Sequence, residues 1–160
     1  TLSEIKGGLI FYGKGNCASC HSGPLFSDLN FYSIPFPQIG FGKNGFGVDY
    51  GKFNVTFNPD DLYKFRTPPL YNVENTFPYS HSGSVYDLKE SIIYHFDPLR
   101  NYKPEEYSEI DRNEYYKKLT SSGSEMELIP YLDDNELDNL VDFLKTLSFP
   151  AKDQKLTKAN

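Results

Sequence analysis

Two cysteines three positions apart, followed at once by a histidine, constrain this chain more than any other feature. They are Cys17, Cys20 and His21, in the sequence Cys-Ala-Ser-Cys-His. Thiols at this spacing can reach the two vinyl positions on one side of a porphyrin, and the next residue can place an imidazole under the iron. The segment therefore predicts one covalently attached c-type haem, with His21 as an axial ligand.

Three other interpretations of the two cysteines carry less weight. A redox-active dithiol usually opens a helix after a strand in a βαβ unit, and no such pattern surrounds Cys17. A structural zinc site normally needs four ligands, and the chain has no further cysteine. A chance match in an exported disulfide protein is the third alternative.

Composition limits the remaining possibilities. At 160 residues the chain has the length of one ordinary domain, and its 13 Tyr and 13 Phe can fill much of a core. The net charge of −6 leaves no basic patch for a nucleic acid. No run of about 18 apolar residues is present to span a membrane. Since the sequence starts at Thr1 without a leader, we expect a processed exported protein or a fragment.

The sequence predicts three helices. The first covers residues about 3–15, with Ser3 as the cap, an apolar spacing of Ile5, Leu9 and Tyr12, and a Gly7-Gly8 pair that would permit close helix contact. The second covers residues 87–96 and is capped by Asp87. The third covers residues 134–147, where Asp133 is the cap and the apolar stripe consists of Leu137, Leu140, Val141, Leu144 and Leu147.

The regions between these helices are rich in glycine, proline and aromatic residues. We expect insertions at about 28–64 and 99–124, with room for a short β-hairpin, and a polar tail at 151–160. The glycine-rich segment 40–47 is a loop by composition, because it lacks the ending of a phosphate-binding loop. The predicted fold is a single all-α, cytochrome c-type haem domain over residues 1–150, with long loops.

The second axial ligand of the iron is open to three candidates: His81, His95 and Met126. His95 follows Leu88 and Ile92 at helical spacing, so all three side chains face the same, inward side. His81 lies in a turn-rich segment, where it could bond to backbone or to a haem propionate. Met126 lies between two glutamates in a polar stretch. The pattern favours His95.

Four linked segments resemble the bacterial di-haem cytochrome c peroxidases and their MauG-like relatives, in the order found in that family. They are GKGNCASCHSGP at 13–24, FRTPPLYNV at 65–73, PYSHSGSV at 78–85 and LKESIIYH at 88–95. The resemblance is to the C-terminal domain of that family, which carries an electron-transferring haem.

The resemblance also implies roles for individual residues. The family supplies the sixth ligand from the position of His95, as Met in the peroxidases and as Tyr in the MauG-like branch; Tyr94 is the fallback here. Arg66 matches a basic position beside a propionate, and Pro68, Leu70 and Tyr79 fall in the matching haem-binding segments. The chain departs from the family in having one haem motif and no Trp, so peroxidase activity does not transfer to it.

Two imidazoles on the iron would leave no open position for peroxide. We therefore expect a six-coordinate haem that transfers electrons, at a lower potential than a His/Met site. The alternatives are a peroxidase or MauG-like oxidase whose sixth position opens, and a haem-based sensor. The partner would be a redox protein or a second haem domain, steered by charge, and we expect the protein in the periplasm or otherwise exported.

Overall fold

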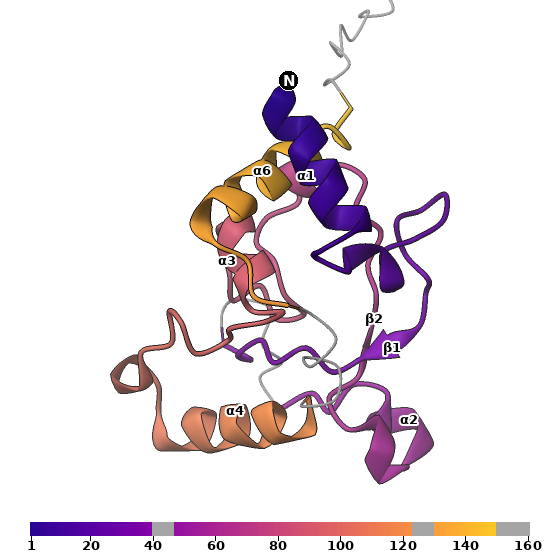
Figure 1. Cartoon of the computed structure of the whole chain (residues 1–160). Coiled ribbons are helices and arrows are strands. Elements are labelled where there is room, and N and C mark those ends of the chain that lie inside the picture. Colours follow the sequence, from indigo (N-terminus) through magenta and orange to yellow (C-terminus); the bar gives the residue numbers. More distant parts are fainter. Residues whose placement is uncertain (40–46, 123–129, 150–160) are drawn as a thin grey trace, which may run out of the picture.

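The structure, a computed structural model, describes residues 1–39, 47–122 and 130–149. It is mostly helical, as the sequence predicts. The elements are α1 (Leu2–Tyr12), η1 (Cys17–Ser19), β1 (Phe31–Tyr32), α2 (Phe53–Thr56), η2 (Pro59–Asp61), β2 (Phe65–Arg66), η3 (Val73–Asn75), α3 (Leu88–Ile93), η4 (Pro104–Glu106), α4 (Glu109–Ser121) and α6 (Asp134–Lys145). Helices α1, α3 and α6 gather on one side, and α2 and α4 lie on the other (Figure 1).

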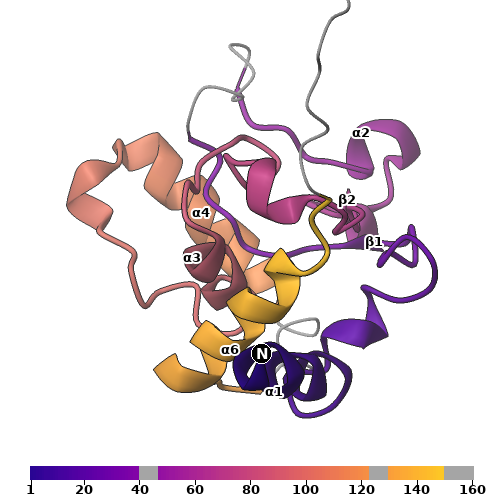
Figure 2. The ribbon, with the colours of Figure 1, turned by 90° about the horizontal axis from the view of Figure 1, so that it is seen from above.

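Helix α1 lies against α6, as expected from its glycine pair (Figure 2). A Cβ atom at Gly7 would overlap the carbonyl of Asn139 on α6, whereas one at Gly8 would reach Phe143 only at ordinary contact distance, 3.4 Å. The close approach of the two helices therefore depends on Gly7. The Ser3 hydroxyl adds a hydrogen bond across the same crossing, 2.6 Å from a carboxylate oxygen of Asp142.

Helix α1 begins earlier than predicted and buries a different face. Thr1 is the N-cap, in a capping box with Glu4, because Ser3 is already inside the first turn. The buried residues are Gly7, Ile10 and Phe11. The apolar residues Ile5, Leu9 and Tyr12 are exposed to 64%, 70% and 63%. Glycine carries no apolar signal, so the face that contacts α6 is not the most apolar one.

The other two predicted helices form close to where they were expected. Helix α6 begins after Asp133, which caps it together with Glu136, and it buries Leu137, Leu140 and Leu144. Helix α3 begins after Asp87, whose carboxylate accepts a hydrogen bond from the backbone N–H of Glu90 at 2.8 Å. It ends at Ile93, earlier than predicted, and the chain continues as a turn through His95.

Buried side chains form two clusters. The first joins α1, α3 and α6 and consists of Ile10, Phe11, Val73, Ile93, Leu132, Leu137, Leu140 and Leu144. The second consists of Val85, Tyr94 and Tyr115, with Phe36, Tyr79, Tyr102 and Leu119 packed against it. Tyr79 contacts both clusters. The second cluster is thus built mainly from aromatic side chains, whereas the first is mainly aliphatic.

The two insertions contain the short β-structure for which the sequence left room and one helix that it did not predict. Strands β1 and β2 pair antiparallel, with Phe31 opposite Arg66, so the small sheet closes the base of the 28–64 insertion. The 99–124 insertion contains α4, a helix of 13 residues that the sequence did not predict. The apolar periodicity of α4 is weak because only two of its side chains are buried, Tyr115 and Lys118, and a lysine does not count as apolar.

Within the described ranges, no helix is both long enough and apolar enough to cross a bilayer. The glycine-rich loop at 40–46, Met126 and the tail at 151–160 lie outside those ranges.

Candidate functional site

The Cys17–His21 segment is held by the end of α1. Gly15 comes so close to α1 that a Cβ atom there would lie 2.9 Å from the carbonyl oxygen of Ile10 and 3.3 Å from Sγ of Cys17. Asn16 follows with a left-handed backbone, φ 52°, and the chain then turns into η1. The backbone N–H of His21 donates to the carbonyl of Cys17 at 2.9 Å, which completes a compact turn. The two cysteines and the histidine therefore have a defined backbone geometry.

The properties of the two thiols disfavour the dithiol and zinc interpretations. Both cysteines are free. Burial raises the pKa of the Cys17 thiol to about 11, whereas a reactive dithiol needs a lowered pKa. No group of three or more His, Cys, Asp or Glu side chains with metal-binding geometry occurs in the described part of the chain. Cys17 therefore lacks the lowered pKa of a reactive dithiol, and the described residues add no further ligands of a zinc site to the two cysteines.

The imidazole of His21 is oriented by the backbone that follows it. Its Nδ1 lies 3.0 Å from the carbonyl oxygen of Phe26. Because a carbonyl only accepts, Nδ1 carries the proton and Nε2 carries the lone pair. Burial lowers the pKa of His21, and the Phe26 carbonyl, the charge of Asp28 and the Pro68 carbonyl partly oppose this effect. At neutral pH the ring is therefore neutral, the form that binds a metal ion.

The imidazole of His95 is oriented in the same way as that of His21. Its Nδ1 lies 2.9 Å from the carbonyl oxygen of Ser91, one turn earlier, which again leaves Nε2 with the lone pair. Burial and the nearby charge of His21 lower the pKa of His95 to about 4. His21 is thus close enough to His95 to act on it electrostatically, although 74 positions separate the two residues in the sequence.

This donor set fits an iron porphyrin. Two neutral imidazoles, each fixed at Nδ1 by a carbonyl, match the usual outer support of metal-binding histidines. Apolar side chains that are only partly buried pack against the first core cluster, and several come from the same segments as the two histidines: Cys17, Ala18 and Phe26 near His21, and Leu88, Ile92 and Phe96 near His95. A large apolar group would find both ligands and apolar walls there.

The other predicted site residues lie around this region. Leu70 and Tyr79 pack against the first cluster, and the Tyr79 hydroxyl donates to the carbonyl of Val73 at 3.0 Å. The Pro68 carbonyl is among the groups that act on His21. Arg66 is exposed at the end of β2, and no ion-pair partner for it occurs among the described residues. Its guanidinium is therefore available to an anionic group.

The alternative ligands differ from His95 in their surroundings. Tyr94 is buried in the second cluster, with its ring 5.1 Å from that of Phe36. His81 is half-exposed, lies 2.8 Å from a carboxylate oxygen of Asp49, and stacks on Phe65 with 4.0 Å between ring centroids. Met126 lies outside the described residues. The charge of His21 acts on His95, whose pKa it helps to lower.

Three groups that support the two histidines could not be recognised from the sequence. The two supporting carbonyls, of Phe26 and Ser91, belong to the backbone and leave no signal in residue identity. Phe36 reaches the site from the 28–64 insertion and packs edge-on against His95, with 5.7 Å between ring centroids. The role of Phe36 becomes visible only in the folded chain, where its ring contacts His95.

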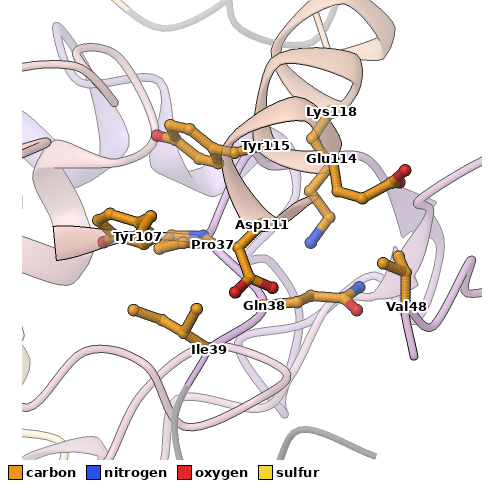
Figure 3. A pocket seen from close by; sticks show the side chains of 9 residues that line it. All are labelled: Pro37, Gln38, Ile39, Val48, Tyr107, Asp111, Glu114, Tyr115 and Lys118. Carbon is orange, nitrogen blue, oxygen red and sulfur yellow. The ribbon is translucent and has the colours of Figure 1, made fainter. Parts of the chain in front are cut away.

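A separate small pocket lies beside α4, and none of the predicted site residues lines it (Figure 3). Lys118 points into it and donates from Nζ to the carbonyl of Phe36 at 2.9 Å. Burial lowers the pKa of Lys118 to about 7, although the charges of Asp49 and Glu114 oppose this effect. The pocket is separate from the pair of histidines, and its lysine anchors α4 to the 28–64 insertion.

Comparison with known proteins identifies relatives of this chain. It is 33% identical over 116 residues to the cytochrome-c peroxidase IdrP1 of Pseudomonas sp. (strain SCT), covering 58% of this chain and 31% of that protein. It is 32% identical over 128 residues to the methylamine utilization protein MauG of Methylorubrum extorquens, covering 75% of this chain and 34% of MauG. The chain matches no protein-family model.

The fold has a counterpart among solved structures. A MauG-like protein associated with microbial copper homeostasis superimposes with a TM-score of 0.69 and 29% identity, over 92% of this chain and 47% of that one. The chain spans about a third of the length of the curated relatives it matches. It is therefore homologous to one part of the di-haem cytochrome c peroxidase and MauG proteins.

Proposed function

We propose that this chain is a monohaem c-type cytochrome domain that transfers electrons. Cys17 and Cys20 would hold one haem c by thioether bonds, and His21 and His95 would be its axial ligands. The observation that carries this proposal is the pair of buried imidazoles, each fixed at Nδ1 by a backbone carbonyl, with His21 close enough to His95 for its charge to lower the pKa of His95. The homology to haem peroxidases supports the cofactor.

The residues of this chain would have distinct tasks at the site. When bound, the haem supplies a one-electron ferric/ferrous couple. The carbonyls of Phe26 and Ser91 fix the orientation of the two imidazoles, so little rearrangement accompanies a change of charge. Leu70 and Tyr79 would exclude water from one edge. Arg66, exposed and without an ion-pair partner in the described ranges, would bind a propionate.

The proposal also places this chain within its longer relatives. Residues 1–150 would form a single cytochrome c-type domain, corresponding to the C-terminal domain of the di-haem proteins. The partner would be a redox protein or a second haem domain, and the net charge of −6 favours a basic one. Because c-type haem is attached outside the cytoplasm, the protein would be periplasmic or otherwise exported.

A peroxidase or MauG-like oxidase is the second candidate, because the curated relatives carry these names. It would require that His95 leave the iron and open a position for peroxide. The two candidates differ in the ferric resting state. A low-spin ferric haem that binds cyanide slowly supports electron transfer, whereas a high-spin haem that binds cyanide rapidly supports the enzyme.

The deciding experiment compares ferric wild-type protein with His95→Ala by low-temperature EPR and optical spectroscopy, after expression with the c-type haem maturation machinery. We expect low-spin bis-imidazole signals in the wild type and a high-spin ferric haem in the variant. Unchanged low-spin signals in His95→Ala would remove this residue from the iron. His81→Ala is the matched control and should retain the wild-type spectrum.

A further inference from the structure

The segment that follows His21 folds back and places a carboxylate beside it. The backbone N–H of Asp28 donates to the carbonyl of Cys20 at 2.8 Å, which ties the two positions together. Phe26 and Leu29 make this reversal possible with left-handed backbones, φ 50° and φ 60°. The same reversal brings the Phe26 carbonyl to His21. One short loop thus supplies both a hydrogen-bond acceptor and a negative charge next to the histidine.

Hydrogen bonds keep the Asp28 carboxylate in place and ionised. The Tyr32 hydroxyl donates to it at 2.7 Å, and the backbone and side-chain N–H groups of Asn30 donate at 2.9 and 3.0 Å. Burial opposes ionisation, but these donors outweigh it and hold the pKa of Asp28 below its usual value. Tyr32 also interacts with the thiol of Cys20. The carboxylate is therefore a fixed anion at the predicted attachment segment.

The field of this anion reaches the histidine. The charge of Asp28 is one of the influences that raise the pKa of His21 against the effect of burial. A negative charge that stabilises a proton on the ring also stabilises additional positive charge on a metal ion bound to that ring. Ferric iron carries one more positive charge than ferrous iron, so the same field favours the ferric state.

We propose that Asp28, held by Tyr32 and Asn30, sets the reduction potential of the bound haem by placing a fixed negative charge beside His21. The inference rests on the proposed haem site. Asp28 touches neither the iron nor a substrate in this arrangement, so it is a positioning residue that acts through electrostatics. Its effect is to lower the potential, in the same direction as the second imidazole.

The test is spectroelectrochemical titration of the haem-loaded protein. Asp28→Asn removes the charge and nearly preserves the shape, so we expect a more positive midpoint potential. A roughly tenfold change in the reduction equilibrium corresponds to about 59 mV for one electron. Glu109→Gln removes the same charge from the exposed start of α4, far from α1 and η1 in both ribbon views, and should leave the potential unchanged (Figures 1 and 2).

A second variant gives a shift of the opposite sign. Tyr32→Phe removes one donor from the carboxylate and leaves its charge less compensated, so the potential should move to more negative values. A structural disturbance alone would not move the two variants in opposite directions. The Asp28→Asn shift should also shrink at high ionic strength, because the carboxylate is only partly buried.

The results separate failure of this inference from failure of the proposed function. If Asp28→Asn keeps the low-spin bis-imidazole spectrum and its potential matches that of Glu109→Gln, the role of Asp28 is overturned while the haem site stands. If the wild-type protein shows no bis-imidazole spectrum, the proposed function itself fails. Should Asp28→Asn fail to take up haem, a Tyr32→Phe potential that is unchanged or more positive overturns the inference.

Discussion

Gly7 on α1 lies directly against the carbonyl of Asn139 on α6, with no space for a side chain between the two helices. This contact sets the distance between α1 and α6, and α1 leads directly into the Cys17–His21 turn. The position of the attachment segment thus depends on a residue that carries no functional group.

Replacing Gly7 should therefore destabilise the protein much more than replacing its neighbour. Gly7→Ala forces the helices apart, at a cost of about 1–3 kcal/mol typical of overpacking. Gly8→Ala meets Phe143 at 3.4 Å and gains up to about 1 kcal/mol of helix propensity. Guanidinium unfolding followed by circular dichroism measures both. Equal free energies of unfolding for the two variants would show that the helices separate without cost.

Stability should also depend on the buried amine of Lys118. Its pKa is about 7 in the folded protein and has its ordinary value of 10.5 in the unfolded chain. Between these values the unfolded chain binds more protons, so the free energy of unfolding rises with pH, by at most about 1.4 kcal/mol per pH unit. Lowering the pH toward 7 therefore destabilises the protein, and below 7 this contribution has been lost.

The measurement is chemical unfolding between pH 7.5 and 9.5. In this range the Lys118 amine is mostly neutral in the folded protein and protonated in the unfolded chain. Lys118→Met should remove most of the rise with pH. Lys117→Met is the matched control, since its side chain is 62% exposed, and it should keep the wild-type slope. A wild-type slope in Lys118→Met would show that the buried amine stays protonated in the folded state.

Much of the fold could be predicted where local signals agree. Asp133 and Asp87 cap the helices that the sequence assigned to them, because a cap and an apolar stripe are encoded within a few residues. The face of α1 could not be predicted in this way. Periodicity identifies an apolar face, but the contact with α6 depends on Gly7, and Ile5 and Leu9 remain exposed.

Helix α4 shows a second limit of sequence patterns. Its buried side chains are Tyr115 and Lys118, and neither contributes to an apolar stripe. The lysine is buried because its amine reaches the Phe36 carbonyl and packs over the rings of Tyr63 and Phe65, which lie in the other insertion or directly after it. These partners lie 53 or more positions away along the chain, so no local window contains them.

The candidate site also contains residues that the sequence predicts and groups that it does not. Cys17, Cys20 and His21 are adjacent in sequence, and their spacing alone predicts the cofactor. His95 could be selected from its inward phase on a helix, although it lies in the turn after α3. The carbonyls of Phe26 and Ser91 belong to the backbone, and the place of the Asp28 anion depends on a backbone turn; residue identity specifies neither.

His81 should prove to be structural. Its imidazole pairs with Asp49 and stacks on Phe65, in a half-exposed position. Such a pair contributes about 0–1 kcal/mol, so His81→Ala should change the free energy of unfolding by no more than about 1 kcal/mol. Its ferric EPR spectrum should be that of the wild type. A change to high-spin signals would instead place His81 on the iron.

Arg66 provides the last prediction, and its sign is opposite to that of Asp28. Its guanidinium, which we propose binds a haem propionate, is exposed and has no ion-pair partner in the described part of the chain, so removing it should cost little stability. A positive charge near the iron favours the ferrous state. Arg66→Gln should therefore lower the midpoint potential, by about threefold in the reduction equilibrium or about 30 mV.

The matched control is Arg100→Gln, because Arg100 loses the same charge but pairs with Asp134 at the start of α6, at 2.8 Å. Its potential should stay at the wild-type value, whereas its stability should fall slightly. If both arginine variants lower the potential equally, net charge and not a propionate contact explains the effect. A potential that moves only in Arg66→Gln supports a contact between this guanidinium and a haem propionate.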